Sequence, residues 1–128
     1  KLAGLNLISL QKGPYAHDSA TPPAGLTLLD PTHALHSMDD TAALLMGLDV
    51  LVSVDTSCVH LAGGLGRPVI LLDRFDNCWR WGHGSHTSAW YPTLRILRQT
   101  QPRCWGTVIA QLCHGLRAMV RHKRCRAG

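Results

Sequence analysis

The stretch DVLVSVDTSCVHLAGGLGRPVILL, residues 49–72, decides the fold class of this chain. Val50–Val54 is an apolar run rich in β-branched residues and interrupted only by Ser53, and Asp55–Ser57 ends it with three residue types that cap helices. Cys58–Leu65 fits one short helix, which a glycine and a proline stop before a second apolar run at Val69–Leu72. The stretch therefore predicts a strand, a helix and a strand, as in a parallel α/β sheet whose central strand is Val50–Val54.

This unit also predicts where a ligand would bind. Ligands of parallel α/β sheets bind beyond the carboxyl ends of the strands, at the turns that lead into helices. The N-terminus of a helix presents unpaired N–H groups and a partial positive charge, which together favour a phosphate. We therefore expect a functional site at the Asp55–Ser57 turn.

The rest of the chain continues the alternation of strands and helices. Further strands are expected at residues 5–10, 26–29 and 94–97, and helices at residues 37–47 and 105–120. The pattern predicts one Rossmann-like, mostly parallel sheet of about five strands with flanking helices. The chain has no GxGxxG turn, which argues against an ordinary dinucleotide-binding domain.

Length and composition bound the class of protein. A chain of 128 residues with 45% hydrophobic residues fits a single globular domain. No apolar run approaches the ~20 residues that a membrane-spanning helix needs. Lys1–Ala3 shows neither an initiator Met nor a signal-peptide pattern, which favours a piece of a longer protein. The five Cys are odd in number and lack CxxC spacing, so we expect a reducing, cytoplasmic location rather than a disulfide framework.

Charge is distributed unevenly along the chain. Residues 1–66 hold two Lys against six Asp, residues 67–128 hold eleven Lys or Arg against two Asp, and Glu is absent. Five of the basic residues lie in the last dozen positions: Arg117, Arg121, Lys123, Arg124 and Arg126. Such a basic C-terminus suits contact with nucleic acid or peripheral contact with an anionic membrane. The alternative is a solvated helix end, whose cations complement the helix dipole.

The order of several short motifs resembles a known family. VSVDTSCVHLAGGLGRPVILL at 52–72 is followed by WRW at 79–81, WYP at 90–92 and LRILRQ at 94–99, and SLQKG at 9–13 precedes them. Together they resemble the C-terminal part of heptosyltransferase-like glycosyltransferases, glycosyltransferase family nine. The resemblance is to the form attached to tetratricopeptide repeats in bacterial proteins, and it covers nearly the whole chain.

The resemblance implies the GT-B architecture, in which two Rossmann-like halves face each other across the active site. The C-terminal half of such enzymes binds the nucleotide-sugar donor, so the chain is expected to be an incomplete donor-binding half of an inverting glycosyltransferase. A strand and a phosphate-facing loop that usually precede the equivalent of residues 5–10 are absent, as is the acceptor-binding half. We therefore expect no catalytic residue in the chain and no turnover from it alone.

Partners follow from the same resemblance. The nucleotide-diphosphate sugar would bind as donor substrate, so no cofactor is expected. The N-terminal half or the tetratricopeptide-repeat region of the parent protein would be the protein partner. With the preceding strand absent, an exposed sheet edge also favours self-association.

Five residues are expected to contact the donor: Lys12, Asp55, Thr56, Ser57 and His60. By analogy with the family motif, Thr56 and Ser57 would place hydroxyls and N–H groups on the diphosphate; their alternative role is to cap the helix, worth roughly 1 kcal/mol. Asp55 would orient a sugar hydroxyl or a Lys, because a carboxylate repels a phosphate. His60 lies one helical turn after Thr56 and would donate to a phosphate oxygen or to the leaving group, unless it is only packed. Lys12 would meet the leaving diphosphate, unless it is an ordinary exposed Lys.

The long segment at residues 73–92 lacks clear periodicity, which is typical of a functional loop. Its three Trp and its Tyr91 would either stack on a sugar or base, or anchor the loop to the sheet. A metal site is not expected, because Cys78, His83 and His86 lack the paired spacing of structural zinc sites.

We considered three functions for the chain. The first is donor binding for an inverting glycosyltransferase. The second is a non-catalytic Rossmann-like domain that binds a nucleotide weakly or holds a partner. The third, specific binding of nucleic acid through the C-terminal arginines, lacks a recognition helix or an aromatic platform beside the charge and is not expected.

Overall fold

The computed structural model describes residues 4–127, so Lys1–Ala3 lie outside the described part. The strands are β1 (Leu7–Ile8), β2 (Leu28–Leu29), β3 (Leu51–Ser53), β4 (Val69–Asp73) and β5 (Leu94–Arg98). The α-helices are α1 (Met38–Gly47), α2 (Ser57–Gly64) and α3 (Gly106–Ala127), and 3-10 turns lie at Ala16–Ala20, Thr32–Ala34 and Trp79–Trp81. Every strand and helix expected from the sequence is present near its expected place, so the α/β class is confirmed.

The strands form two sheets rather than the single sheet that we expected. β1 and β2 pair in parallel, and β3, β4 and β5 form a parallel three-stranded sheet in that order. The middle strand is therefore β4, and the prediction that Val50–Val54 is central is wrong. Within the described residues β3 pairs only with β4, and Val54 at its end is 47% exposed. An apolar run predicts burial of the strand's faces, but it does not report whether strands lie on both edges.

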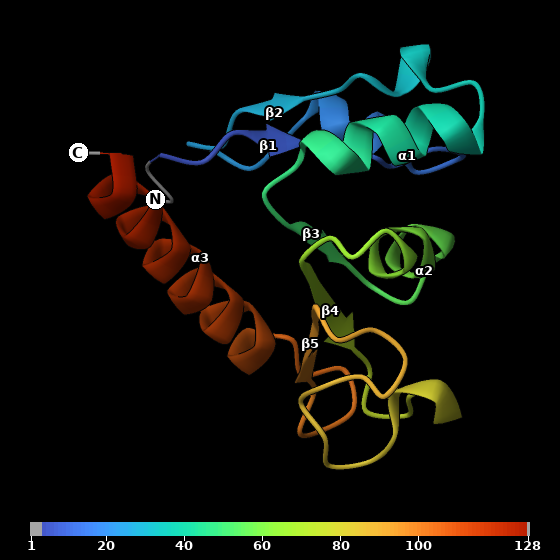
Figure 1. The fold of residues 1–128 in the computed structure, drawn as a ribbon, viewed down its shortest axis with the longest axis vertical. Coiled ribbons are helices and arrows are strands. Elements are labelled where there is room, and N and C mark those ends of the chain that lie inside the picture. The colour runs from blue at the N-terminus through green and yellow to red at the C-terminus, as the bar shows by residue number, and fades with distance from the viewer. Residues whose placement is uncertain (1–3, 128) are drawn as a thin grey trace.

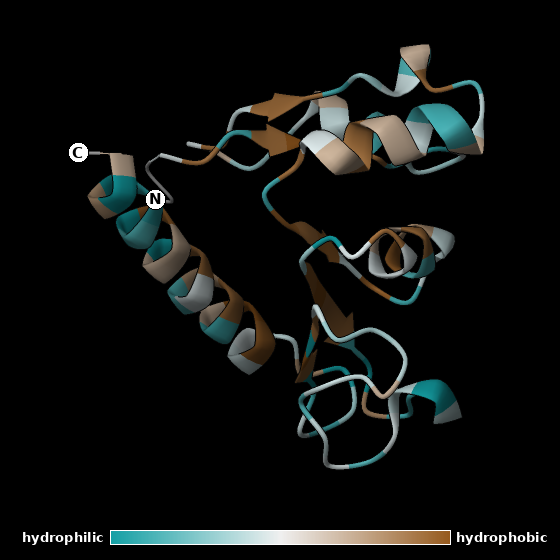
Figure 2. Cartoon of the chain, viewed as in Figure 1, coloured by the Kyte–Doolittle hydropathy of each residue, from teal (hydrophilic) through white to brown (hydrophobic). Residues whose placement is uncertain are grey.

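Helices flank the three-stranded sheet on both sides. Figure 1 shows α1 and α2 on one side, while α3 crosses the other side from β5 toward β1. The brown strands in Figure 2 mark the apolar interior. Its fully buried members are Leu45, Leu51, Val59, Ala62, Val69, Leu71, Trp81, Leu94 and Ile96. Burial of one such side chain stabilises the fold by about 1.5–3 kcal/mol, so this core fixes the β3–α2 turn relative to β4.

α1 begins with a capping box at Ser37. The Ser37 hydroxyl accepts from the N–H of Asp40, and the Asp40 carboxylate accepts from the N–H groups of His36 and Ser37. The bonds from the His36 N–H and from Ser37 hold the pKa of Asp40 below its ordinary value. These reciprocal bonds fix where α1 starts.

α2 ends in a Schellman motif. The N–H of Gly66 donates to the carbonyl of Gly63 at 3.0 Å, and the N–H of Arg67 donates to the carbonyl of Ala62 at 2.9 Å. Gly66 has a φ of 69°, a backbone conformation that strains residues with a Cβ. Gly63 allows a close approach instead, because a Cβ on it would lie 2.5 Å from Cγ of Tyr91. Gly66 thus ends the helix, as we expected, and Gly63 allows its close packing against Tyr91.

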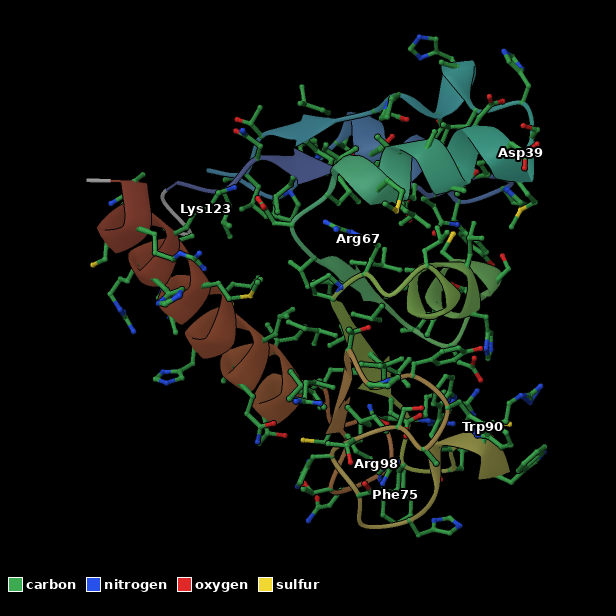
Figure 3. The ribbon with its side chains drawn as sticks, viewed as in Figure 1. Asp39, Arg67, Phe75, Trp90, Arg98 and Lys123 are labelled. Carbon is green, nitrogen blue, oxygen red and sulfur yellow. The ribbon has the colours of Figure 1, made fainter. Side chains whose placement is uncertain are left out.

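α3 extends to Ala127, well beyond the expected end near Val120. The basic C-terminus is therefore part of a helix. Lys123 Nζ lies 2.8 Å from both carboxylate oxygens of Asp49, near the C-terminal end of α3 (Figure 3). Both side chains are exposed, so the pair contributes about 0–1 kcal/mol. Within residues 4–127, no helix combines the length and the apolar character needed to cross a membrane.

Candidate functional site

A cavity of about 1150 Å³ lies between the two sheets. Its walls come from β1 and β3 with their flanking residues, from the start of α2 and from the C-terminal half of α3. Three of the five residues expected to bind a donor line it, namely Lys12, Thr56 and Ser57. They follow the carboxyl ends of β1 and β3, which is the end where ligands of parallel sheets bind.

The start of α2 has no side-chain cap, although Thr56 occupies the N-cap position. Its backbone is extended, with φ −142° and ψ 169°, as an N-cap residue requires. Its hydroxyl, however, lies 3.1 Å from Oγ of Ser53 at the end of β3. The capping bond that we considered as the alternative role of Thr56 is therefore not made. The first N–H groups of α2 thus lack a side-chain partner, which suits an anion.

Lys12 reaches the same cavity from the smaller sheet. It follows β1, and its ammonium donates to the backbone carbonyl of Leu35. Leu35 itself is buried, at 7% exposure. Lys12 is an exposed residue whose ammonium is tethered to this carbonyl. An ammonium has three N–H donors, so Lys12 retains donors for a ligand while it holds this carbonyl.

His60 and Asp55 are absent from the cavity lining and contact each other instead. Nε2 of His60 lies 3.5 Å from Oδ1 of Asp55, and Nδ1 lies 2.9 Å from the hydroxyl of Tyr91. The His60 ring also stacks on Trp81, with ring centroids 5.4 Å apart. Both nitrogens of His60 therefore have partners within the chain. The five expected residues thus divide into a cavity group and a separate His60–Asp55 pair.

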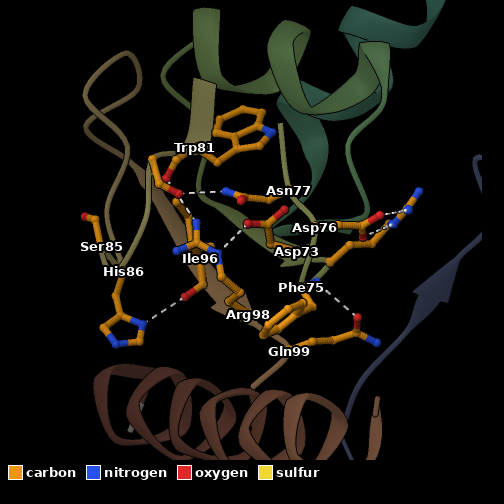
Figure 4. Close-up of polar contacts among 12 residues, drawn as sticks. Asp73, Phe75, Asp76, Asn77, Trp81, Ser85, His86, Ile96, Arg98 and Gln99 are labelled. Atoms are coloured by element: carbon orange, nitrogen blue, oxygen red, sulfur yellow. Dashed lines mark hydrogen bonds and ion pairs between the residues drawn. The ribbon is translucent and has the colours of Figure 1, made fainter. Parts of the chain in front are cut away.

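A buried ion pair holds the loop that carries Trp81. Asp73, at the end of β4, is 3% exposed and accepts a hydrogen bond from Nε of Arg98 at 2.7 Å. Arg98 lies at the end of β5 and also donates to the carbonyl of Trp81 at 3.0 Å (Figure 4). The ion pair therefore holds the backbone of Trp81, whose ring stacks on the imidazole of His60.

The same loop turns two Trp side chains outward. Trp79 is 73% exposed and Trp90 is 59% exposed, and their rings meet edge to face with centroids 6.4 Å apart. Nε1 of Trp90 donates to the carbonyl of Arg80, whose guanidinium lies 5.6 Å from the centroid of the Trp79 ring. Figure 3 shows Trp90 at the outer edge of the molecule. Trp81 thus anchors the loop, while Trp79 and Trp90 present their faces to solvent.

The cysteines are all free thiols. Cys78 accepts a hydrogen bond from the guanidinium of Arg80 at 3.0 Å. Among residues 4–127, no three His, Cys, Asp or Glu side chains gather closely enough to hold a metal ion.

Sequence reasoning missed the roles of Asp73 and Arg98, and it did not predict the bond between Tyr91 and His60. The first two have opposite charges at the ends of consecutive strands and are partners in the β4–β5 register. An alignment of these two strands in parallel register would have predicted that the two side chains form an ion pair. The hydroxyl partner of Tyr91 had no comparable signal, because it depends on how the loop folds back onto α2.

Comparison with known proteins gives one modest similarity. No family model matches this chain, and no solved structure matches it. The chain is similar to Protein FlbA of Caulobacter vibrioides, with 28% identity over 80 residues. The matched region covers 62% of this chain and 13% of FlbA, so the chain spans a small part of that relative's length.

Proposed function

We propose that the chain is the donor-binding portion of a heptosyltransferase-like glycosyltransferase and that its cavity takes the diphosphate of a nucleotide sugar. One observation carries the proposal: Lys12 and the uncapped start of α2 line one cavity from opposite sheets. Both lie beyond the carboxyl ends of parallel strands. The DTxxxHLA, WRW and WYP motifs, in that order along the chain, support the same function.

The chemistry of this end of the cavity suits a diphosphate. Thr56 and Ser57 offer hydroxyls, the first turn of α2 offers N–H groups, and Lys12 offers a charged donor. A hydrogen bond to a charged group contributes about 1.5–3 kcal/mol. In this arrangement the Asp55–His60 pair lies beside the phosphates, where Asp55 would accept from a sugar hydroxyl.

The proposed role stops short of turnover by the chain alone. A catalytic base would come from an acceptor-binding half, and that half would be the partner across the cleft. We place the protein in the cytoplasm, where nucleotide sugars are made and consumed.

Calorimetric titration with ADP, UDP and GDP, and with the matching nucleosides, tests the proposal. We expect one nucleoside diphosphate to bind clearly more tightly than its nucleoside, because the phosphates make the charged contacts. Thr56→Ala should weaken that diphosphate about tenfold, since tenfold corresponds to about 1.4 kcal/mol. Thr100→Ala, in an exposed loop outside the cavity lining, is the matched control. Equal affinity for diphosphate and nucleoside, or no binding of either, would contradict the proposal.

The alternative is a non-catalytic Rossmann-like domain that binds a nucleotide weakly or holds a partner. It is favoured by the contacts that Lys12 and His60 already make within the chain. Lys12→Met separates the two functions. If Lys12 serves only the Leu35 carbonyl, the variant loses stability but keeps its nucleotide affinity; if Lys12 contacts the diphosphate, affinity falls as well.

A further inference from the structure

We propose that the cavity between β1 and β3 is a slot for one extended strand of a partner polypeptide, which would join the two sheets into one. This inference does not depend on the nucleotide site. Within residues 4–127, β1 pairs only with β2 and β3 pairs only with β4, so each strand turns an unpaired edge to the cavity. Such an edge presents N–H and C=O groups that pair readily with another strand.

The bonds on the far sides of these strands identify the groups that face the slot. The N–H of Ser9 donates to a carbonyl of β2 at 2.7 Å, and the N–H of Leu51 donates to the carbonyl of Pro68 at 2.9 Å. Successive residues of a strand direct their N–H groups to opposite neighbours. The N–H groups of Ile8 and Val52 therefore point toward the slot, one from each side.

The size of the cavity fits a single strand. A strand of five residues is about 17 Å long and takes up about 4.8 Å between its neighbours and about 10 Å across the sheet, or roughly 800 Å³. The cavity measures about 1150 Å³. The volume of one strand with its side chains is therefore comparable with that of the cavity.

The cavity walls determine the chemistry of the occupant. α3 contributes Leu116 and Met119, of which Met119 is 38% exposed, and both bordering strands are apolar (Figure 2). The side chain of Arg124 lies against Gly4, and Lys123, which is paired with Asp49, lines the cavity where α3 ends. Gly4 precedes β1, so the guanidinium of Arg124 is the cation at the amino end of the slot. The occupant is thus apolar along its length, acidic at its amino end and parallel to both neighbours, whose arrows point to the same side in Figure 1.

A designed peptide provides the probe. β4 already lies between two parallel strands, so its sequence Val69–Leu72, preceded by Asp and followed by two Lys for solubility, has the required character. Its binding to the 128-residue chain is measured by fluorescence anisotropy, and amide hydrogen exchange is followed by NMR. We expect the amides of Ile8 and Val52 to exchange at least tenfold more slowly with peptide bound. The amide of Leu51, which is already bonded within the sheet, should not change.

Two controls make the test specific. A peptide with Pro at its two central positions lacks the required N–H groups and should not bind. Met119→Glu should weaken the first peptide at least tenfold, whereas Ile109→Glu, an exposed position of the same helix outside the cavity lining, should not. The exchange measurement on the unmodified chain decides the question even if Met119→Glu does not fold.

Three results would overturn the proposal. These are no binding of the first peptide, equal binding of both peptides, or unchanged exchange at Ile8 and Val52 in the bound state. A fourth would reassign the slot to a second copy of the chain: slow exchange at both amides without peptide, together with a concentration-dependent dimer in sedimentation.

Discussion

Replacement of Gly63 by Ala tests how closely α2 packs on the loop that carries Tyr91. A Cβ at this position would lie 2.5, 2.7 and 2.9 Å from three ring atoms of Tyr91. Carbon atoms in contact prefer about 3.5–4.0 Å, so the ring would have to retreat by about 1 Å. The ring is not free to do so, because the Tyr91 hydroxyl is bonded to His60 and its carbonyl accepts from the N–H of Leu94.

The expected cost follows from two opposing terms. Overpacking a well-packed site destabilises by about 1–3 kcal/mol, whereas exchange of Gly for Ala in a helix stabilises by up to about 1 kcal/mol. Gly64→Ala is the matched control, because it adjoins Gly63 in α2 and a Cβ on it meets no atom within 4 Å. We therefore expect Gly63→Ala to be less stable than Gly64→Ala by about 1–3 kcal/mol.

Urea unfolding followed by Trp fluorescence measures both variants. A pair of Gly63→Ala variants, with and without Tyr91→Ala, then shows whether the loss arises at the ring, since removal of the ring should abolish the overpacking cost. If Gly63→Ala and Gly64→Ala prove equally stable, α2 does not pack against Tyr91 as described and the geometry of His60 loses its support.

Two further variants test the polar contacts. Asp73→Asn leaves the guanidinium of Arg98 without its buried partner and should lower the free energy of unfolding by about 3 kcal/mol, whereas Asp76→Asn, in an exposed pair with Arg74, should change it little in the same urea experiment. Hydrogen bonds from Ser19 and Thr32 lower the pKa of Asp30 from 3.8 to about 2, so Asp30 stabilises the fold above pH 3.8 and this contribution is lost as the pH falls toward 2. Ser19→Ala should raise the pKa of Asp30 toward 3.8 in an NMR titration of its carboxyl carbon, and an unchanged midpoint would refute the assignment of the Ser19 bond.

Local pattern was sufficient to predict the elements of this fold. The helix at residues 37–47, the helix stop at Gly66 and the strand at Val69 follow from residue types within a few positions, and the structure has all three. The arrangement of strands was harder to predict. The central position was assigned to Val50–Val54 because its residues are mostly apolar and do not alternate with polar ones, but the strand with neighbours on both edges is β4. The pairing of strand edges depends on segments far apart in the chain. A run of apolar residues does not indicate which other strands will lie beside it.

The site shows the same division between local and distant information. The turn at Thr56 and Ser57 could be located from sequence, because a strand end and a helix start adjoin there. The sequence predicted that all five residues contact one donor, but His60 and Asp55 do not line the cavity that Lys12, Thr56 and Ser57 share. His60 is one helical turn from Thr56, but the position of its ring is set by Trp81 and Tyr91 from the distant loop. Contacts of this kind become predictable only once the course of the loop is known.

The strand slot and the proposed diphosphate site belong to one cavity, which couples their occupants. Lys12 belongs to the β1 sheet and Thr56 to the β3 sheet, and within the described residues the two sheets share no strand pairing. A diphosphate bound between these residues must hold the sheets at a fixed separation. A strand bound in the slot would already fix that separation. Nucleotide binding would then lose less free energy to the ordering of the two sheets. Coupling of this kind is reciprocal, so the nucleotide must strengthen peptide binding by the same factor by which the peptide strengthens nucleotide binding. Equal nucleotide affinities with and without saturating peptide would contradict the coupling and show that the sheets hold their separation unaided.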